Sequence, residues 1–273
     1  MHHHSAGRHD VVTTIRIFGH RTWATIPRRG RPAVILLHGG MSSSASLLRT
    51  IGPGLGEHFA IGAFDRRGHG RTGDTAEPFT YESMADETIA FIESLDRRVH
   101  LVGHSDGGNI ALLVGQRRPD LIKRMVVVGA NFHYSGLLDF PLMQPDSPDF
   151  EQWALKYALH APEGIAHAHE VLAKTNEMFR TGPTMSVADL AEIDVPVLVM
   201  AGDDDVATFE HTTTMFESIR GAQLAVIPGA SHAVLKEQTK ECVRIVQRFL
   251  RQKLPVVTYS PLRRAPAGEF PGD

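Results

Sequence analysis

Residues 101–110 read "LVGHSDGGNI", and Ser105 lies in this stretch between Gly103 and Gly107. The residues match the pattern G-x-S-x-G, which is typical of a serine held on a sharp turn between a strand and a helix. The pattern is short enough to occur by chance, and a glycine turn without chemistry is the alternative interpretation. The surrounding sequence therefore has to distinguish between these two interpretations.

The neighbouring sequence predicts the strand and the helix that such a turn needs. The run "RVHLV" (98–102) precedes Ser105, and "GGNIALLVGQRRP" (107–119) follows it with apolar residues at helical spacing. A side chain at Gly103 or Gly107 would crowd the strand against the helix. The N–H groups and the dipole at the start of this helix can stabilise negative charge that develops beside the hydroxyl.

Other short apolar runs, several without alternation, predict strands that are buried on both faces. They follow a predicted N-terminal hairpin (11–18 and 21–26) and are separated by helical patterns such as residues 80–95. These runs are residues 33–37, 59–64, 98–102, 125–129, 195–202 and 222–227. Strands that alternate with helices indicate an α/β protein with a mostly parallel, twisted sheet flanked by helices.

One interval, from Asn131 to Asp194, breaks this alternation. It contains helical patterns around residues 150–160, 163–180 and 186–192 but no convincing strand, which predicts a small helical cap inserted into the core. The expected organisation is a flexible N-terminus of residues 1–9, an α/β core of residues 10–130 and 195–253, a cap of residues 131–194 and a flexible C-terminal tail of residues 254–273.

The composition is that of an ordinary globular protein. Of the 273 residues, 42% are hydrophobic and 22% are charged, and the net charge of −3 gives no electrostatic reason to expect a nucleic-acid partner. The single cysteine, Cys242, excludes an internal disulfide, and no run reaches the roughly 18 apolar residues of a membrane span. We therefore expect a cytoplasmic protein without a membrane span, whose partner is a small-molecule substrate; the oligomeric state stays open.

A serine hydroxyl is a weak nucleophile near neutral pH and needs a base and a carboxylate that orients the base. Both residue types occur downstream at predicted strand ends, as three acids in "GDDD" (202–205) and as His232 in "GASH" (229–232). The chain order serine, aspartate, histidine is the order found with this strand-turn-helix arrangement.

Five motifs at predicted strand ends together resemble the α/β-hydrolase fold superfamily. They are "HGG" (38–40), "DRRGHGRT" (65–72), "GHSDGG" (103–108), "GDDD" (202–205) and "GASH" (229–232), and the resemblance covers roughly residues 10–252. It implies that Ser105 is the nucleophile, that His232 is the general base and then the general acid, and that Asp205 holds the imidazole. A slip of register among the three acids stays open, and Asn131 disfavours an acid after the preceding strand.

The resemblance also implies an oxyanion hole formed by the backbone N–H groups of Gly40 and Asp106. A carboxylate at Asp106 is a departure from the family pattern, because its charge would oppose that of the oxyanion. We therefore expect its side chain to turn outward into the first helical turn. Asp65 and Arg66 are expected to connect their loop to the floor of the site.

The candidate substrate-binding residues lie beside the oxyanion loop, after a strand end and in the cap. They are Met41, Phe132, His133, Tyr134 and Trp153, and further apolar cap residues are Phe140, Met143, Tyr157, Met178 and Phe179.

No cofactor and no metal are expected. His38 and His69 lie in loops where a histidine usually bonds to backbone, and the spacing of His167 and His169 points them to different sides of a helix. "GHGRTG" (68–73) matches a dinucleotide fingerprint formally, but no helix opens after it.

These motifs predict a carboxylesterase-like serine hydrolase that cleaves an ester or lactone of a small to medium apolar acid through an acyl-enzyme. The sharp turn at Ser105 does not distinguish this reaction from other reactions that proteins of the same fold catalyse. A carbon–carbon bond hydrolase, a thioesterase, an amidase and a cofactor-free haloperoxidase or lyase stay open, as does a non-catalytic ligand-binding receptor.

Overall fold

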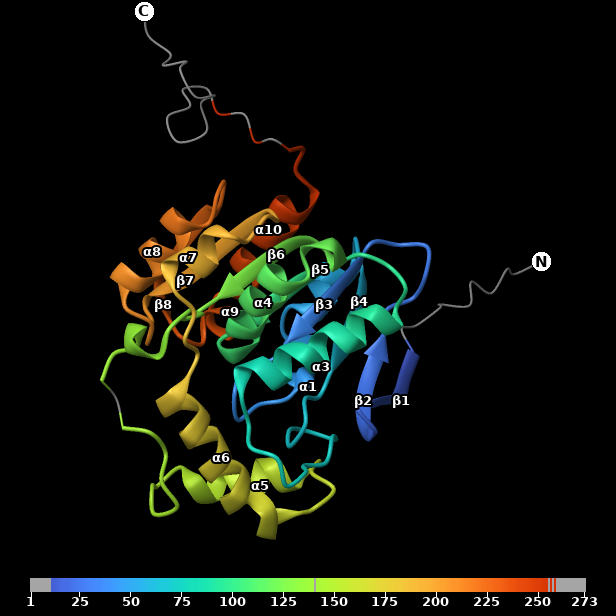
Figure 1. Ribbon diagram of the computed structural model, residues 1–273, viewed down its shortest axis with the longest axis vertical. Coiled ribbons are helices and arrows are strands. Elements are labelled where there is room, and N and C mark those ends of the chain that lie inside the picture. Colours follow the sequence, from blue (N-terminus) through green and yellow to red (C-terminus); the bar gives the residue numbers. More distant parts are fainter. Residues whose placement is uncertain (1–10, 140, 255, 257, 259–273) are drawn as a thin grey trace, which may run out of the picture.

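The computed structural model describes residues 11–139, 141–254, 256 and 258 of the chain (Figure 1). The described strands form one eight-stranded sheet in the order β1-β2-β4-β3-β5-β6-β7-β8. Of the expected flexible termini, only residues 254, 256 and 258 belong to the described residues; the remainder lies outside them, as do Asp10 and Phe140.

The predicted N-terminal hairpin forms one edge of the sheet. It consists of β1 (Val11–Ile17) and β2 (His20–Ile26), which pair antiparallel, and β2 also pairs antiparallel with β4 (Ala60–Phe64). All other pairings are parallel, and they join β4, β3 (Ala33–Leu37), β5 (Val99–His104), β6 (Ile122–Val128), β7 (Val197–Asp204) and β8 (Gln223–Ser231). This confirms the α/β class with a mostly parallel sheet.

Helices cover both faces of the sheet, which is why its central strands show no alternation. Every residue of β3 and of β4 is buried. One face packs against α3 (Tyr81–Ser94), α4 (Asp106–Arg117), α7 (Val187–Ala191) and α8 (Phe209–Ser218). The other packs against α1 (Ser44–Arg49), α2 (Gly52–Gly56), α9 (Val234–Glu237) and α10 (Thr239–Arg251), where Cys242 is fully buried.

The interval between β6 and β7 contains no strand in its described residues, apart from isolated bridges. It contains α5 (Phe150–Ala158) and α6 (Ala168–Thr181), with short 3₁₀ turns at Tyr134–Gly136 and Ile165–His167. In Figure 1, α5 and α6 lie away from the two helical layers, beyond one end of the sheet. Another 3₁₀ turn, Pro119–Leu121, precedes β6.

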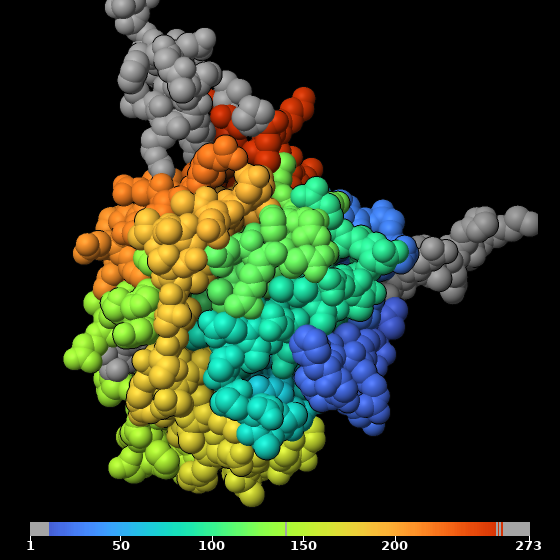
Figure 2. Space-filling view, in the orientation of Figure 1, coloured from blue at the N-terminus to red at the C-terminus, as the bar shows by residue number. Residues whose placement is uncertain are grey.

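Hydrogen bonds connect the insertion of residues 131–194 to the loop between β4 and α3. The N–H of Asp74 donates to Glu163, and Lys174 on α6 donates to Asp74 Oδ2 at 2.7 Å and to the Thr75 carbonyl at 2.6 Å. In the space-filling view the surface of the insertion continues directly into the surface of this loop (Figure 2). No helix among the described residues has the length and apolarity needed to cross a bilayer.

Candidate active site

Ser105 occupies a strained turn between β5 and α4. Its φ is 55° and its ψ is −124°, a conformation that a residue with a Cβ adopts only when the surroundings enforce it. The turn is held because the Ser105 N–H donates to the Val128 carbonyl at 2.8 Å, while the Ser105 carbonyl accepts from the N–H of Gly108 at 2.7 Å. The strand-turn-helix predicted from the sequence therefore exists.

The two glycines of the motif are required by close backbone contacts. A Cβ at Gly103 would overlap the backbone of Gly107 and Gly108, and a Cβ at Gly107 would overlap the carbonyl groups of Leu37 and His38. The strand β5, the helix α4 and the end of β3 therefore approach one another more closely than any side chain would permit.

The structure brings Ser105, His232 and Asp205 together at the carboxyl ends of three parallel strands. His232 follows β8, and its Nε2 lies 3.0 Å from Ser105 Oγ. Asp205 follows β7, and its Oδ1 lies 2.6 Å from His232 Nδ1. Both distances are within hydrogen-bond range, so the three side chains form a continuous chain of contacts.

The charge state of Asp205 suits a role as hydrogen-bond acceptor. Burial favours the neutral carboxyl, but the hydrogen bond and the charge of His232 outweigh it and lower the pKa of Asp205 below its usual value. An ionised Asp205 fixes the tautomer in which Nδ1 of His232 carries the proton. Nε2 is then free to accept the proton of Ser105.

The neighbouring acids have other surroundings, which settles the contact of the imidazole in favour of Asp205. Asp203 Oδ1 accepts from the N–H of Ala230 at 3.1 Å, and Asp204 is exposed. The pairing of β7 with β8 shifts between Gly202 and Asp204, and this irregularity precedes the turn that carries Asp205. Asn131 exchanges hydrogen bonds with Asn109 of α4, at 2.8 Å and 3.0 Å.

Two contacts that the sequence reasoning missed hold the His232 loop. His104, the residue before the serine, donates from Nε2 to the His232 carbonyl at 2.8 Å. Burial, together with the charge of His232, lowers the pKa of His104 to about 4, so this ring is neutral at physiological pH. Glu237 accepts from the N–H and the hydroxyl of Ser231, both at 2.8 Å. The position of His104 inside G-x-S-x-G is the only sequence signal for it.

The loop that carries Gly39 and Gly40 is supported from below by Arg66. This buried guanidinium donates to the His38 carbonyl at 2.6 Å and to the Gly39 carbonyl at 3.2 Å. Asp65 in turn accepts from the N–H and the hydroxyl of Ser44. The expectation that Asp65 and Arg66 connect their loop to the floor of the site is confirmed.

Asp106 does not turn outward, and this expectation was wrong. Its carboxyl is buried, Oδ1 accepts from the Tyr81 hydroxyl at 2.8 Å, and Oδ2 is buried without a partner. A Cβ on Gly40 would overlap Oδ2, so the carboxyl lies directly beside the Gly40 loop. Burial raises the pKa of Asp106 against the opposing effects of Arg66 and Tyr81. The helix α3, which supplies Tyr81, closes over the first turn of α4 and leaves no solvent for the side chain.

A cavity of about 230 Å³ lies over Ser105 and His232. Of the predicted substrate-binding residues, Met41 and the cap residue Phe179 line it. Tyr81, Leu137 and Val206 also line it, but the sequence analysis did not predict them. Phe132 instead stacks on His211 with ring centroids 3.8 Å apart, and Tyr134 stacks on His133. Trp153 lines a neighbouring cavity. The lining contains Gly40, Met41, Tyr81, Ser105, Asp106, Gly129, Asn131, Leu137, Phe179, Gly182, Val206 and His232.

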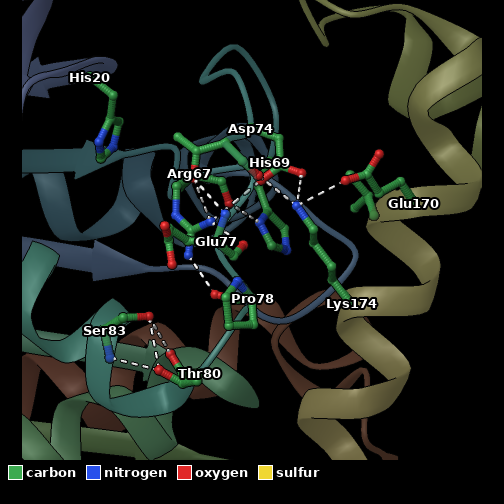
Figure 3. A network of polar contacts seen from close by, with 12 residues as sticks. His20, Arg67, His69, Asp74, Glu77, Pro78, Thr80, Ser83, Glu170 and Lys174 are labelled. Carbon is green, nitrogen blue, oxygen red and sulfur yellow. Dashed lines mark hydrogen bonds and ion pairs between the residues drawn. The ribbon is translucent and has the colours of Figure 1, made fainter.

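An ion-pair network joins the loop of residues 65–80 to α6 (Figure 3). Asp74, His167 and Glu170 place ligand atoms within 4.8 Å of one another, a spacing that a metal ion can use. The ammonium of Lys174, however, lies 2.7 Å from Asp74 Oδ2 and 3.2 Å from Glu170 Oε1. These carboxylates therefore already have a cationic partner, and the cluster acts as a fastening between the loop and α6.

The histidines of the loops contact backbone. His38 Nδ1 lies 2.7 Å from the Gly39 carbonyl, and His69 Nδ1 lies 3.0 Å from the Arg67 carbonyl. No helix opens at Gly73, where a bend and an irregular segment follow.

Comparison with known proteins agrees with this fold. The model of the Alpha/beta hydrolase family matches residues 34–245. The chain is 29% identical over 230 residues to the putative carbamate hydrolase RutD of Agrobacterium fabrum, which covers 74% of this chain and 87% of the relative. It is 26% identical over 241 residues to serine hydrolase BPHL of Mus musculus, with 81% and 80% covered.

Among solved structures, the enol-lactonase of Burkholderia xenovorans superimposes with a TM-score of 0.71 at 19% identity, covering 88% of this chain and all of that one. An identity this low supports the fold alone. The family match spans well over half of the sequence and includes the ends of the strands that carry Ser105 and Asp205. This protein belongs to the alpha/beta hydrolase family.

Proposed function

We propose that this protein is a serine hydrolase that cleaves an ester or lactone of a small to medium apolar acid. One observation carries the proposal: Ser105 Oγ, His232 and Asp205 are linked by contacts of 3.0 Å and 2.6 Å at the floor of a cavity. This geometry is what a hydroxyl needs to lose its proton to an imidazole as it attacks a carbonyl carbon.

In the proposed reaction, Ser105 Oγ forms a bond to the substrate carbonyl carbon while His232 Nε2 takes the hydroxyl proton. The imidazolium is stabilised by Asp205 and then gives its proton to the departing alcohol, which leaves an acyl-enzyme. Water, deprotonated by the same imidazole, releases the acid in the second half of the reaction.

The oxyanion of each tetrahedral intermediate is proposed to bind the N–H groups of Gly40 and Asp106. Neither N–H donates to another group among the described residues, and both residues line the cavity with Ser105. Asp106 begins α4, so its N–H has no acceptor one helical turn earlier. Two fixed donors at this place stabilise developing negative charge.

The size and lining of the cavity support the proposed substrate class. A volume of about 230 Å³ accommodates a short acyl group, and Met41, Leu137, Phe179 and Val206 present apolar surface to it. Leu137 and Phe179 belong to the insertion of residues 131–194, which we propose acts as a cap over the acyl group. The name of one relative, a serine hydrolase, is compatible with this class.

A carbamate or amide is the second candidate, and Asp106 is the observation that favours it. Its Oδ2 is buried without a partner at the cavity wall, where it would accept a hydrogen bond from a substrate N–H that an ester lacks. A relative named as a putative carbamate hydrolase fits this alternative. Comparing kcat/KM for an aryl ester and an aryl carbamate of equal size separates the two.

The test of the main proposal is covalent labelling with a fluorophosphonate, followed by peptide mapping. We expect the label on Ser105, no label on Ser105→Ala, and turnover of short-chain aryl esters or lactones by the native protein. Labelling that persists in Ser105→Ala, or tight binding of esters with no release of product, contradicts the proposal and favours a receptor.

A further inference from the structure

A second cavity lies beside the one over Ser105. It has a volume of about 260 Å³ and is enclosed by the start of α1, the loop at residues 68–70 and α5 of the insertion. Met41 lines both cavities and therefore forms a shared wall. A ligand that passes Met41 would occupy both.

The lining of the second cavity is rich in hydrogen-bonding groups and contains no carboxylate. Ser42, Ser43 and Ser46 line it at the start of α1, and none of their hydroxyls bonds to another group in the described part of the chain. Arg49 of α1 and Lys156 of α5, both with exposed side chains, add two positive charges to the lining. Such a set of donors suits an anionic group.

The two cations are not neutralised by neighbouring acids. Neither Arg49 nor Lys156 has a carboxylate partner among the described residues, and Lys156 Nζ contacts only Gln152 Oε1, at 3.3 Å. Three acids influence the nearby Tyr157 hydroxyl: Asp74 and Glu170 are paired with Lys174, and Glu163 Oε1 accepts from the N–H of Asp74. An anion in this cavity would therefore meet positive charge that has no other partner.

Two buried polar atoms in the same lining also lack a partner. The Tyr157 hydroxyl and His69 Nε2 are both inaccessible to solvent and unbonded. His69 is 2% exposed, and its Nδ1–H donates to the Arg67 carbonyl, so Nε2 is a free acceptor. A buried polar group without a partner is costly, so an anionic oxygen would suit the Tyr157 hydroxyl as an acceptor, whereas His69 Nε2 needs a donor and does not itself favour an anion.

The backbone of the shared wall is hydrogen-bonded to α5. Met41 has a φ of 53°, and its carbonyl accepts from Trp153 Nε1 of α5 at 3.0 Å. The insertion thus fixes the boundary between the two cavities and contributes Lys156 and Tyr157 to the second one.

We propose that the second cavity binds a carboxylate or phosphate group carried on the alcohol part of the substrate, while the acyl group occupies the cavity over Ser105. The placement of the acyl group rests on the proposed function. The binding of the anion does not, because it requires no turnover.

The first test is therefore a binding measurement on the Ser105→Ala protein. Phenyl phosphate and benzoate are titrated separately by isothermal titration calorimetry at low ionic strength, which distinguishes phosphate from carboxylate recognition. We expect saturable binding of at least one probe and a Kd about tenfold higher or more after Arg49→Gln/Lys156→Gln.

The matched control is Arg29→Gln/Lys123→Gln, which removes the same two charges from exposed positions outside the cavity. It should leave the Kd unchanged. No saturable binding of either probe, or an equal loss of affinity in both double variants, overturns the proposed anion site.

The second test uses two butanoate esters whose alcohol parts are 4-hydroxybenzoate and 4-hydroxybenzamide. We expect a lower KM for the charged ester with similar kcat, and loss of that preference in Arg49→Gln/Lys156→Gln. Hydrolysis of both esters with equal KM overturns the anion site and leaves the proposed function intact. Anion binding without hydrolysis of either ester overturns the proposed function and leaves the anion site intact.

Discussion

Asp205 Oδ1 lies 2.6 Å from His232 Nδ1, although the two residues follow different strands and are separated by a complete helix and strand. Both β7 and β8 run parallel and end at the same edge of the sheet, and the shift in their pairing after Gly202 leads into the turn that carries Asp205. The contact with the imidazole thus depends on backbone pairing as well as on residue type.

The first prediction concerns the three consecutive acids. We expect Asp205→Asn to lower kcat by about 10³–10⁴-fold, because an amide stabilises neither the required tautomer nor the imidazolium. Asp204→Asn, at an exposed position of the same strand, should leave kcat unchanged. Steady-state kinetics on an ester that the native protein cleaves provide the measurement. A larger loss in Asp204→Asn would show that the assignment of the acid is wrong.

The second prediction concerns the close approach of α4 to the end of β3 at the sharp turn that carries Ser105. Gly107→Ala places a Cβ against the Leu37 and His38 carbonyls and should lower the free energy of unfolding by about 3 kcal/mol or more. The control Gly56→Ala, where the nearest atom to the new Cβ is 3.9 Å away, should be neutral or stabilising by up to about 1 kcal/mol. Urea unfolding followed by circular dichroism measures both, and equal stabilities would contradict this account of the turn.

The third prediction concerns the size of the acyl cavity. Phe179 lies on α6 and lines the cavity, so Phe179→Ala should enlarge it and move the preferred acyl chain of ester substrates to a longer one. Phe209→Ala, at a side chain that is 63% exposed on α8, should leave the preference unchanged. The readout is kcat/KM across aryl esters of increasing chain length. An unchanged profile in Phe179→Ala would exclude this residue from the acyl site.

The fourth prediction concerns stability in acid. Burial, together with Lys123 and Arg124, lowers the pKa of His100 from 6.5 to about 4. The unfolded chain therefore binds a proton that the folded chain rejects, so the stability that His100 contributes is complete above pH 6.5 and is lost as the pH falls toward 4. The slope for this single group reaches about 1.4 kcal/mol per pH unit.

The variant His100→Phe keeps a ring against Phe59 and removes the titration. We expect it to lose less stability than the native protein between neutral pH and pH 5, measured by urea unfolding at each pH. The exposed His160→Gln should follow the native protein. The same acid dependence in native protein and His100→Phe would assign the effect to other groups.

The sequence predicted most of the fold because the signals for its elements are local. Apolar runs without alternation marked the strands that are buried on both faces, and the helical pattern at residues 80–95 corresponds to α3, whose buried face includes Met84 and Ile92. The insertion was visible as an interval of helical patterns between two strands. Ser105 stood out because only glycine tolerates the close backbone contacts on either side of it.

The contacts of individual side chains were harder to predict from the sequence, because they depend on residues in distant segments of the chain. The direction of Asp106 depended on Tyr81, which belongs to another helix, and the position of the Phe132 ring depended on His211 of α8. Neither contact leaves a local pattern in the sequence. The hydrogen bond from His104 to the His232 carbonyl is of the same kind.

The sequence by itself determined the order of the strands along the chain, the sharp turn at Ser105 and the residue types available at the strand ends, since hydrophobic period and glycine placement act over a few neighbouring residues. Only the tertiary structure decided which acid meets His232, that Asp106 faces inward, and that Met41 separates two cavities. These features arise where segments far apart in the chain pack together. Their geometry depends on the register of the strands and on how the side chains of both segments fill the space between them, and neither segment determines this alone.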